Sequence, residues 1–228
     1  VLENGQYNKI ICNKIPSSSK IGVVNGLAVY GANIGMLMPL EVSCKKVNDR
    51  RGELKVTGIV EEEEITNNNK KIKMKSTAYA SVQNVLTVLD NLFNLSTDRY
   101  DIHVNIPGGM PVDGPSAGIS IATAIYSAIT KQKVNRFVAM TGEISILGSV
   151  KAIGGVKAKI SAAFKGGATK VIIPQENYDK SLNEICEVEI IPVKSLKEVL
   201  GFAIECDEIN SENDKEILSA EANNMFKN

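Results

Sequence analysis

The sequence has 228 residues, of which 43% are apolar and 23% are charged, and these values suit a globular domain with a sizeable core. Its 26 basic and 26 acidic residues balance, so it lacks the basic surplus of a nucleic-acid-binding domain and carries no polybasic membrane anchor. Four cysteines without a C-x-x-C pair and a single histidine argue against a zinc site and indicate reduced thiols, although one disulfide stays open.

Strands separated by polar segments are predicted for the first part of the chain. Residues 1–20 are polar and end in a Pro-Ser-Ser-Ser run, which indicates a linker. The predicted strands are 22–30, 36–44 and 53–60. Residues 61–75 carry four glutamates, then asparagines, then a lysine-rich stretch. This charge pattern predicts a solvated loop or a protruding hairpin whose two arms have opposite charges.

Helices and strands alternate in the rest of the chain. Residues 76–93 have helical spacing, and residues 115–130 are apolar nearly all round, which predicts a helix through the core and not a membrane span. Further helices are expected at 154–167 and 195–200. Further strands are expected at 101–106, 137–140, 144–153 (a strand or a hairpin), 170–174 and 188–192. Residues 203–228 are polar and acidic, as in a tail. The predicted fold class is α/β (mixed α+β), with mixed sheets and packed helices.

One serine lies in a pattern that nucleophiles use. The run Gly114-Pro115-Ser116-Ala117-Gly118 fits G-x-S-x-G. A serine that only caps the following helix would fit the same letters. However, a Gly/Pro-rich loop delivers Ser116 to the start of a core helix, where free N–H groups and the helix dipole can stabilise an oxyanion. Ser116 is therefore a candidate nucleophile.

A serine nucleophile needs a base. In an α/β-hydrolase esterase the histidine follows the serine, whereas the only histidine here, His103, precedes it and lies in a predicted strand, where a packed or hydrogen-bonded role is expected. A lysine can serve if burial keeps it neutral. Lys159 lies beside the apolar face of its predicted helix. That face consists of Val156, Ile160, Ala163 and Phe164. Alternatively, Lys159 lays its methylenes on the core and extends its amine to water.

Several long segments resemble a known family. DIHVNIP, VDGPSAG, VAMTGEIS, LGSVKAIGGVKAK and GATKVIIP closely resemble the proteolytic domain of Lon proteases, and the resemblance covers roughly residues 22–200. It implies that Ser116 and the second lysine of the GG-x-K-x-K motif, Lys159, form the catalytic dyad of a serine endopeptidase that works through an acyl-enzyme. It also implies that Asp113 contacts the dyad lysine and that Thr141 orients it. Without the resemblance, Asp113 suits an Asx-turn and Thr141 a strand end.

The resemblance also implies a domain organisation. We expect a linker from an upstream ATPase module at 1–20, a single Lon-type proteolytic domain at 21–202 and a polar tail at 203–228. The charged segment 61–75 departs from the family pattern and is expected to be an insertion. The chain begins with Val, shows no signal peptide and has no G-x-x-x-x-G-K-[ST] motif. ATP and Mg are therefore expected only in the AAA+ module, and no cofactor or metal in this domain.

The expected partners also follow from the resemblance. They are unfolded or misfolded polypeptides, the AAA+ ATPase module of the same protein and further copies of the chain in a hexamer, with no nucleic acid. The expected location is the cytoplasm, or the cytoplasmic face of the membrane if a part outside this chain provides an anchor. A non-proteolytic Lon-like scaffold attached to an ATPase is the alternative function, and the presence of both Ser116 and Lys159 speaks against it.

Overall fold

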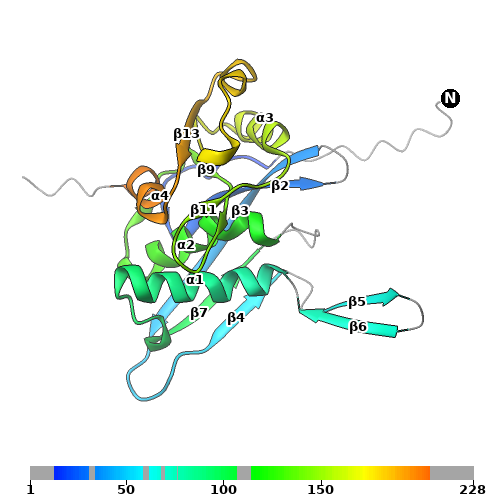
Figure 1. The fold of residues 1–228 in the computed structure, drawn as a ribbon. Coiled ribbons are helices and arrows are strands. Elements are labelled where there is room, and N and C mark those ends of the chain that lie inside the picture. The colour runs from blue at the N-terminus through cyan, green and yellow to red at the C-terminus, as the bar shows by residue number, and fades with distance from the viewer. Residues whose placement is uncertain are drawn as a thin grey trace, which may run out of the picture.

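A seven-stranded mixed sheet forms the centre of the protein (Figure 1). The computed structural model describes residues 13–30, 34–58, 62–67, 70–75, 77–106 and 114–205. The strand order is β13-β12-β9-β2-β3-β7-β4. Their bounds are β2 (Val23–Tyr30), β3 (Ile34–Lys46), β4 (Leu54–Thr57), β7 (Tyr100–Asn105), β9 (Val138–Met140), β12 (Lys170–Pro174) and β13 (Glu189–Val193). Strands β13, β12, β9 and β2 run parallel, β3 is antiparallel to both its neighbours, and β4 is parallel to β7. The expected mixed α/β fold is confirmed.

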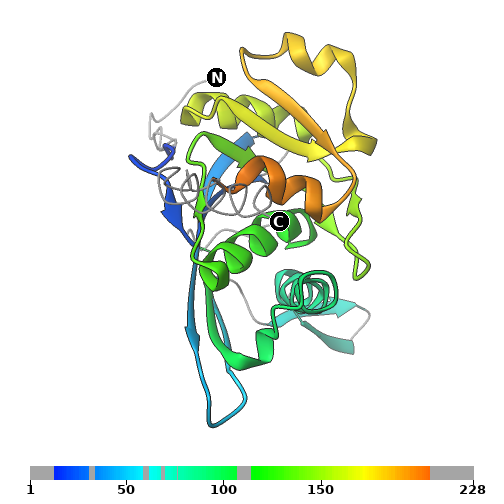
Figure 2. The ribbon, with the colours of Figure 1, turned by 90° about the vertical axis from the view of Figure 1, so that its left-hand side faces the viewer.

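Helices cover both faces of this sheet. They are α1 (Thr77–Phe93), α2 (Gly118–Thr130), α3 (Val156–Gly166) and α4 (Leu196–Ala203). The alternation of side chains along β9 shows the two layers: Val138 and Met140 pack in the core formed with α1, α2 and α4, whereas Ala139 packs in the core formed with α3. Figure 2 shows the yellow-green α3 and the green α2 on opposite sides of the blue strands. Helices α2 and α3 therefore lie on opposite faces of the sheet.

The long apolar segment forms a core helix, as predicted. A 3-10 turn, η2 (Gly114–Ala117), precedes α2, and 11 of the 13 residues of α2 are buried. The α-helix therefore begins at Gly118 and not at Pro115, because the Gly-Pro pair is accommodated in the tighter turn. Within the part of the chain that the structure describes, no helix is long and apolar enough to span a membrane.

The charged segment forms a hairpin apart from the main sheet. Strands β5 (Glu62–Asn67) and β6 (Lys70–Lys75) pair antiparallel, with Glu62 opposite Lys75 and Glu64 opposite Lys73 in the ladder. In Figure 1 this cyan hairpin projects away from the body of the domain. The expectation of a protruding hairpin with oppositely charged arms is confirmed.

A second small hairpin and three short 3-10 turns connect the larger elements. The predicted strand or hairpin at 144–153 is a hairpin of β10 (Glu143–Ile144) and β11 (Val150–Lys151). The remaining 3-10 turns are η1 (Thr97–Arg99), η3 (Gln175–Asn177) and η4 (Lys180–Glu184). The predicted strand at 53–60 is shorter, because β4 ends at Thr57 and is followed by Gly58 with φ of 83°.

The two ends of the described chain pack on the domain and contact each other. Strand β1 (Lys20–Ile21) pairs with β8 (Lys133–Val134), and Ser19 Oγ donates a hydrogen bond to Glu205 Oε1 at 2.6 Å. Main-chain groups of Lys20, Ile21 and Glu205 thus pair with β8. The expected domain bounds of 21 and 202 stay a prediction. Residues 1–12 and 206–228 lie outside the described residues.

Candidate functional site

Two reciprocal main-chain hydrogen bonds hold the turn that carries Ser116. Gly142 N donates to Ser116 O at 2.9 Å, and Ile119 N donates to Gly142 O at 3.1 Å. Ser116 is only 1% exposed. The N-cap residue of α2 is Ala117 and makes no side-chain cap hydrogen bond. Ser116 therefore lies in the 3-10 turn η2 and not in the first α-helical turn, where the sequence predicts it.

Helix α3 brings Lys159 into the interior. The helix begins after Gly155, which has φ of 68°, and Lys159 N closes its first turn on Gly155 O at 3.1 Å. Lys159 is 1% exposed, and its Nζ donates a hydrogen bond to Thr141 Oγ1 at 3.2 Å. The alternative in which the amine reaches water is therefore wrong. Burial removes water from the amine, and the hydroxyl of Thr141 is a hydrogen-bond partner that the structure gives it.

The predicted apolar face of α3 is only partly correct. Ile160 and Ala163 are buried, as expected, and Val156 is half-buried. Phe164, however, is 46% exposed, whereas Lys159 and Ala162 are buried. The buried face is thus rotated toward Lys159 relative to the prediction, because α3 packs against β2 and β3 as well as against β12.

Thr141 joins the lysine to the serine turn. It follows β9 directly and is fully buried, and its main chain is held by a hydrogen bond from Thr141 N to Ile172 O at 3.1 Å. Its hydroxyl donates to Ser116 O at 3.1 Å and accepts from Lys159 Nζ. The structure therefore brings together three of the four predicted site residues. The fourth, Asp113, lies outside the described residues.

The histidine has a separate, structural position. His103 is half-buried on β7, and its Nε2 lies 3.0 Å from Thr57 Oγ1. The same hydroxyl donates to Asn105 Oδ1 at 3.0 Å, so its single proton is already used and His103 is the donor in the pair. The expectation of a hydrogen-bonded strand histidine is confirmed.

Two glycines near the serine were not singled out in the sequence. A Cβ atom on Gly118 would lie 2.8 Å from Ile144 N, and one on Gly142 would lie 3.0 Å from Val150 Cγ1. Both glycines let the serine turn pack directly on the chain that leaves β9. The signal was present in the motifs GPSAG and MTGE, but their glycines could be assigned to close packing only once the two segments were seen side by side.

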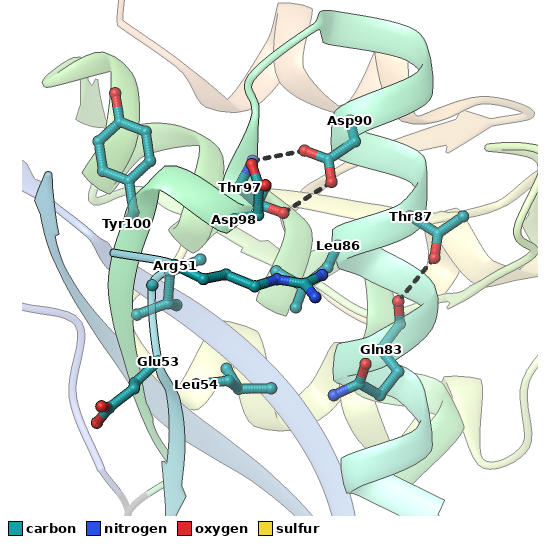
Figure 3. A pocket seen from close by; sticks show the side chains of 12 residues that line it. Arg51, Glu53, Leu54, Gln83, Leu86, Thr87, Asp90, Thr97, Asp98 and Tyr100 are labelled. Atoms are coloured by element: carbon teal, nitrogen blue, oxygen red, sulfur yellow. Dashed lines mark hydrogen bonds between the residues drawn. The ribbon is translucent and has the colours of Figure 1, made fainter. Parts of the chain in front are cut away.

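A cavity of about 290 Å³ lies apart from this site, between α1, β4 and η1 (Figure 3). Leu54, Leu86 and Tyr100 line it together with charged Arg51 and Asp98. Its wall is stiffened where Thr97 N and Thr97 Oγ1 donate to the two carboxylate oxygens of Asp90, at 2.6 and 2.9 Å. None of Ser116, Thr141 and Lys159 lines it. The cavity therefore contributes nothing to the predicted chemistry.

The described residues offer no cluster of three or more His, Cys, Asp or Glu that could hold a metal ion. Cys44 and Cys186 are free thiols, while Cys12 and Cys206 lie outside the described residues. Burial raises the pKa of the Cys44 thiol to about 11, against an opposing effect of Lys131.

Comparison with known proteins identifies the family. The sequence family described as the Lon protease (S16) C-terminal proteolytic domain matches residues 5–206. The chain belongs to this Lon family. It is 54% identical over 200 residues to "Lon protease 2" of Bacillus subtilis (strain 168), covering 88% of this chain and 36% of that protein. It is 38% identical over 203 residues to "Lon protease" of Clostridioides difficile (strain 630), covering 85% of this chain and 24% of that protein.

Archaeal relatives are similarly close. The Lon domain is 36% identical over 197 residues to "Archaeal Lon protease" of Thermoplasma acidophilum, covering 82% of this chain and 28% of that protein. The chain thus spans about a third or less of the length of these three relatives. The chain is thus similar to the proteolytic domain of these Lon proteases, and the resemblance predicted from the sequence is confirmed.

Proposed function

We propose that this Lon domain is a serine endopeptidase in which Ser116 is the nucleophile and Lys159 is its general base. The single observation that supports this best is the buried link between the two residues, in which Thr141 Oγ1 accepts from Lys159 Nζ and donates to Ser116 O. A buried lysine amine close to a serine in a G-x-S-x-G turn is the environment that activates a serine nucleophile.

The proposed reaction has two halves. Neutral Lys159 takes the proton of Ser116 Oγ while the oxygen attacks the scissile carbonyl, and main-chain N–H groups of the serine turn stabilise the oxyanion. The resulting ammonium gives its proton to the leaving amine, which leaves an acyl-enzyme. Water then attacks the ester with Lys159 again as the base, and Ser116 is released. Asp113 is proposed to contact Lys159, and Thr141 to orient it. No metal or organic cofactor enters this chemistry.

We further propose that the domain works within a larger ATP-dependent Lon protease. In this proposal a separate AAA+ module uses ATP and Mg to unfold polypeptides, and six copies assemble into a ring in the cytoplasm that degrades unfolded or misfolded proteins. The names of the relatives support the protease assignment, since each is named a Lon protease and each extends well beyond the matched region. The domain by itself is then expected to cleave short or unfolded peptides slowly and to leave ATP unhydrolysed.

The test is peptide cleavage and labelling by a serine-reactive phosphonate, measured on the purified chain. The wild type should cleave an unfolded peptide and become labelled at Ser116. Ser116→Ala and Lys159→Met should do neither, with circular dichroism and thermal midpoints showing that both remain folded. Lys159→Arg should also be inactive, because a guanidinium cannot be deprotonated near neutral pH. Substantial cleavage by folded Lys159→Arg would refute the lysine base, and a folded but inert wild type would favour the scaffold alternative.

A further inference from the structure

The first turn of α3 lies on a single rung of the β2–β3 ladder. In that ladder Val29 is directly opposite Gly35. A Cβ atom on Gly155 would lie 2.6 Å from Val29 Cγ2, and a Cβ atom on Gly35 would lie 1.9 Å from Ala158 O. Both ends of the turn from Gly155 to Ala158 therefore rest on the same pair of opposed strand residues.

The contact at Gly35 tolerates no larger residue without movement of the backbone. Its neighbour is a main-chain carbonyl, and the carbon of the same carbonyl would lie 2.4 Å from the added Cβ. A side-chain neighbour can rotate away, whereas a helix carbonyl moves only with its helix. Any side chain at Gly35 must therefore separate α3 from β3. Gly154 provides the contrast, because nothing lies within 4 Å of the position of its Cβ.

Lys159 is the residue directly after this contact. Its main-chain N–H belongs to the same turn through the 3.1 Å bond to Gly155 O, so the turn and the base of the side chain move together. Thr141 is held independently, by its hydrogen bond to Ile172 of β12. A shift of α3 against the sheet would therefore change the 3.2 Å separation between Lys159 Nζ and Thr141 Oγ1.

We infer that the Val29–Gly35 rung positions Lys159 for the reaction, and that Gly35 is a positioning residue for the peptidase although it carries no functional group. The inference rests on the proposed function, because it assigns the rung a role in placing the proposed base. Misplacement of a reacting group by about 1 Å lowers rates on the order of 100-fold. A small displacement of α3 is thus sufficient to affect catalysis strongly while the fold persists.

The test compares Gly35→Ala with Gly154→Ala in the purified chain, using a fluorogenic peptide and the serine-reactive phosphonate. Gly35→Ala should lower kcat on the order of 10- to 100-fold with KM within about twofold of wild type, and should slow phosphonate labelling similarly. Gly154→Ala adds the same methyl group just before α3, at a position with open space around it, and should keep the wild-type kcat. A wild-type kcat in folded Gly35→Ala, or an effect on KM alone, would overturn the inference.

A second variant keeps the test informative if Gly35→Ala fails to fold. Val29→Ala removes the methyl groups against Gly155 and introduces no clash, because it only shortens a half-buried side chain. It should remain folded by circular dichroism and lower kcat with little change in KM. If folded Val29→Ala has wild-type kcat and labelling rate, the positioning role is rejected. If the wild type itself neither cleaves nor reacts, the proposed function fails instead.

Discussion

Lys159 and Thr141 form a buried pair in which Nζ donates to Oγ1 at 3.2 Å. The direction of this bond follows from the next one. Thr141 Oγ1 has one proton and directs it to Ser116 O, a carbonyl that can only accept. The hydroxyl therefore has to accept from Lys159, and an amine that donates to it can keep its lone pair for another proton.

Replacing Thr141 by Val should impair catalysis more than folding. The variant keeps the shape of the side chain but leaves both hydrogen bonds unmade, so we expect a stability loss of about 1–3 kcal/mol. We expect kcat to fall about 10- to 100-fold, corresponding to about 1.4–2.7 kcal/mol of lost positioning. Thr141→Ser retains the hydroxyl and should keep most of the activity. The measurements are peptide cleavage and urea unfolding.

A neighbouring buried hydroxyl is the matched control for this prediction. Ser120 Oγ donates to Met140 O at 3.2 Å, one residue before Thr141. Ser120→Ala should therefore reduce stability by about 1 kcal/mol and leave kcat close to wild type. Equal losses of kcat in Ser120→Ala and Thr141→Val would show that Thr141 acts only through general packing.

Substitutions of Lys159 should separate stability from activity. Lys159→Met removes a polar group from a site that is 1% exposed and conserves volume, so the thermal midpoint should equal or exceed that of wild type while cleavage is lost. Lys159→Arg places a larger permanent charge in the same space and should destabilise by about 1–3 kcal/mol from overpacking alone. Differential scanning fluorimetry measures the thermal midpoints of the wild type and the two variants and so checks this order of stability. A Met variant markedly less stable than the Arg variant would contradict the burial argument.

Cys44 should react with alkylating agents only slowly in the folded protein. Burial raises the pKa of its thiol to about 11. The fraction of the thiol in the reactive thiolate form is then on the order of one in a thousand at pH 8. For a thiol with the ordinary pKa of about 8.5 this fraction is about a quarter. Alkylation by iodoacetamide, measured by mass spectrometry of the peptide, should become about tenfold faster per pH unit between pH 8 and 10. In denaturant the thiol should be alkylated at once. Equal alkylation rates of Cys44 in folded and denatured protein would disprove this prediction.

The Arg50–Asp101 pair should make the β3–β4 connection sensitive to acid. Arg50 NH2 lies 2.6 Å from Asp101 Oδ2, and this hydrogen bond, followed by that from Glu53 N, holds the pKa of Asp101 below its usual range. A lowered folded pKa gives stability that is present above the unfolded value of about 3.9 and is lost as pH falls through the folded value. Asp101→Asn should thus lower the thermal midpoint slightly at pH 7, and the difference should shrink below about pH 4. A difference independent of pH would contradict this assignment.

Local patterns in the sequence predicted most of the elements. The 3.6-residue period of 76–93 predicted α1, the uncharged run predicted α2 as a core helix, and the acidic and basic arms of 61–75 predicted a protruding hairpin. Ser116 was found by its motif, and Lys159 by its place beside the apolar face of α3. These features depend on residues that lie close together in the sequence, so the sequence alone predicts them.

The sequence by itself determined that the chain would be a mixed α/β domain with a serine and a lysine in Lon-like motifs. Only the tertiary structure decided that Lys159 is buried and not extended to water, because its burial depends on how α3 packs against the sheet. Likewise, only the tertiary structure brings Ser19 and Glu205 into contact. Such contacts join segments far apart in the chain, and their partners depend on the order of strands in the sheet, which hydrophobic periodicity does not specify.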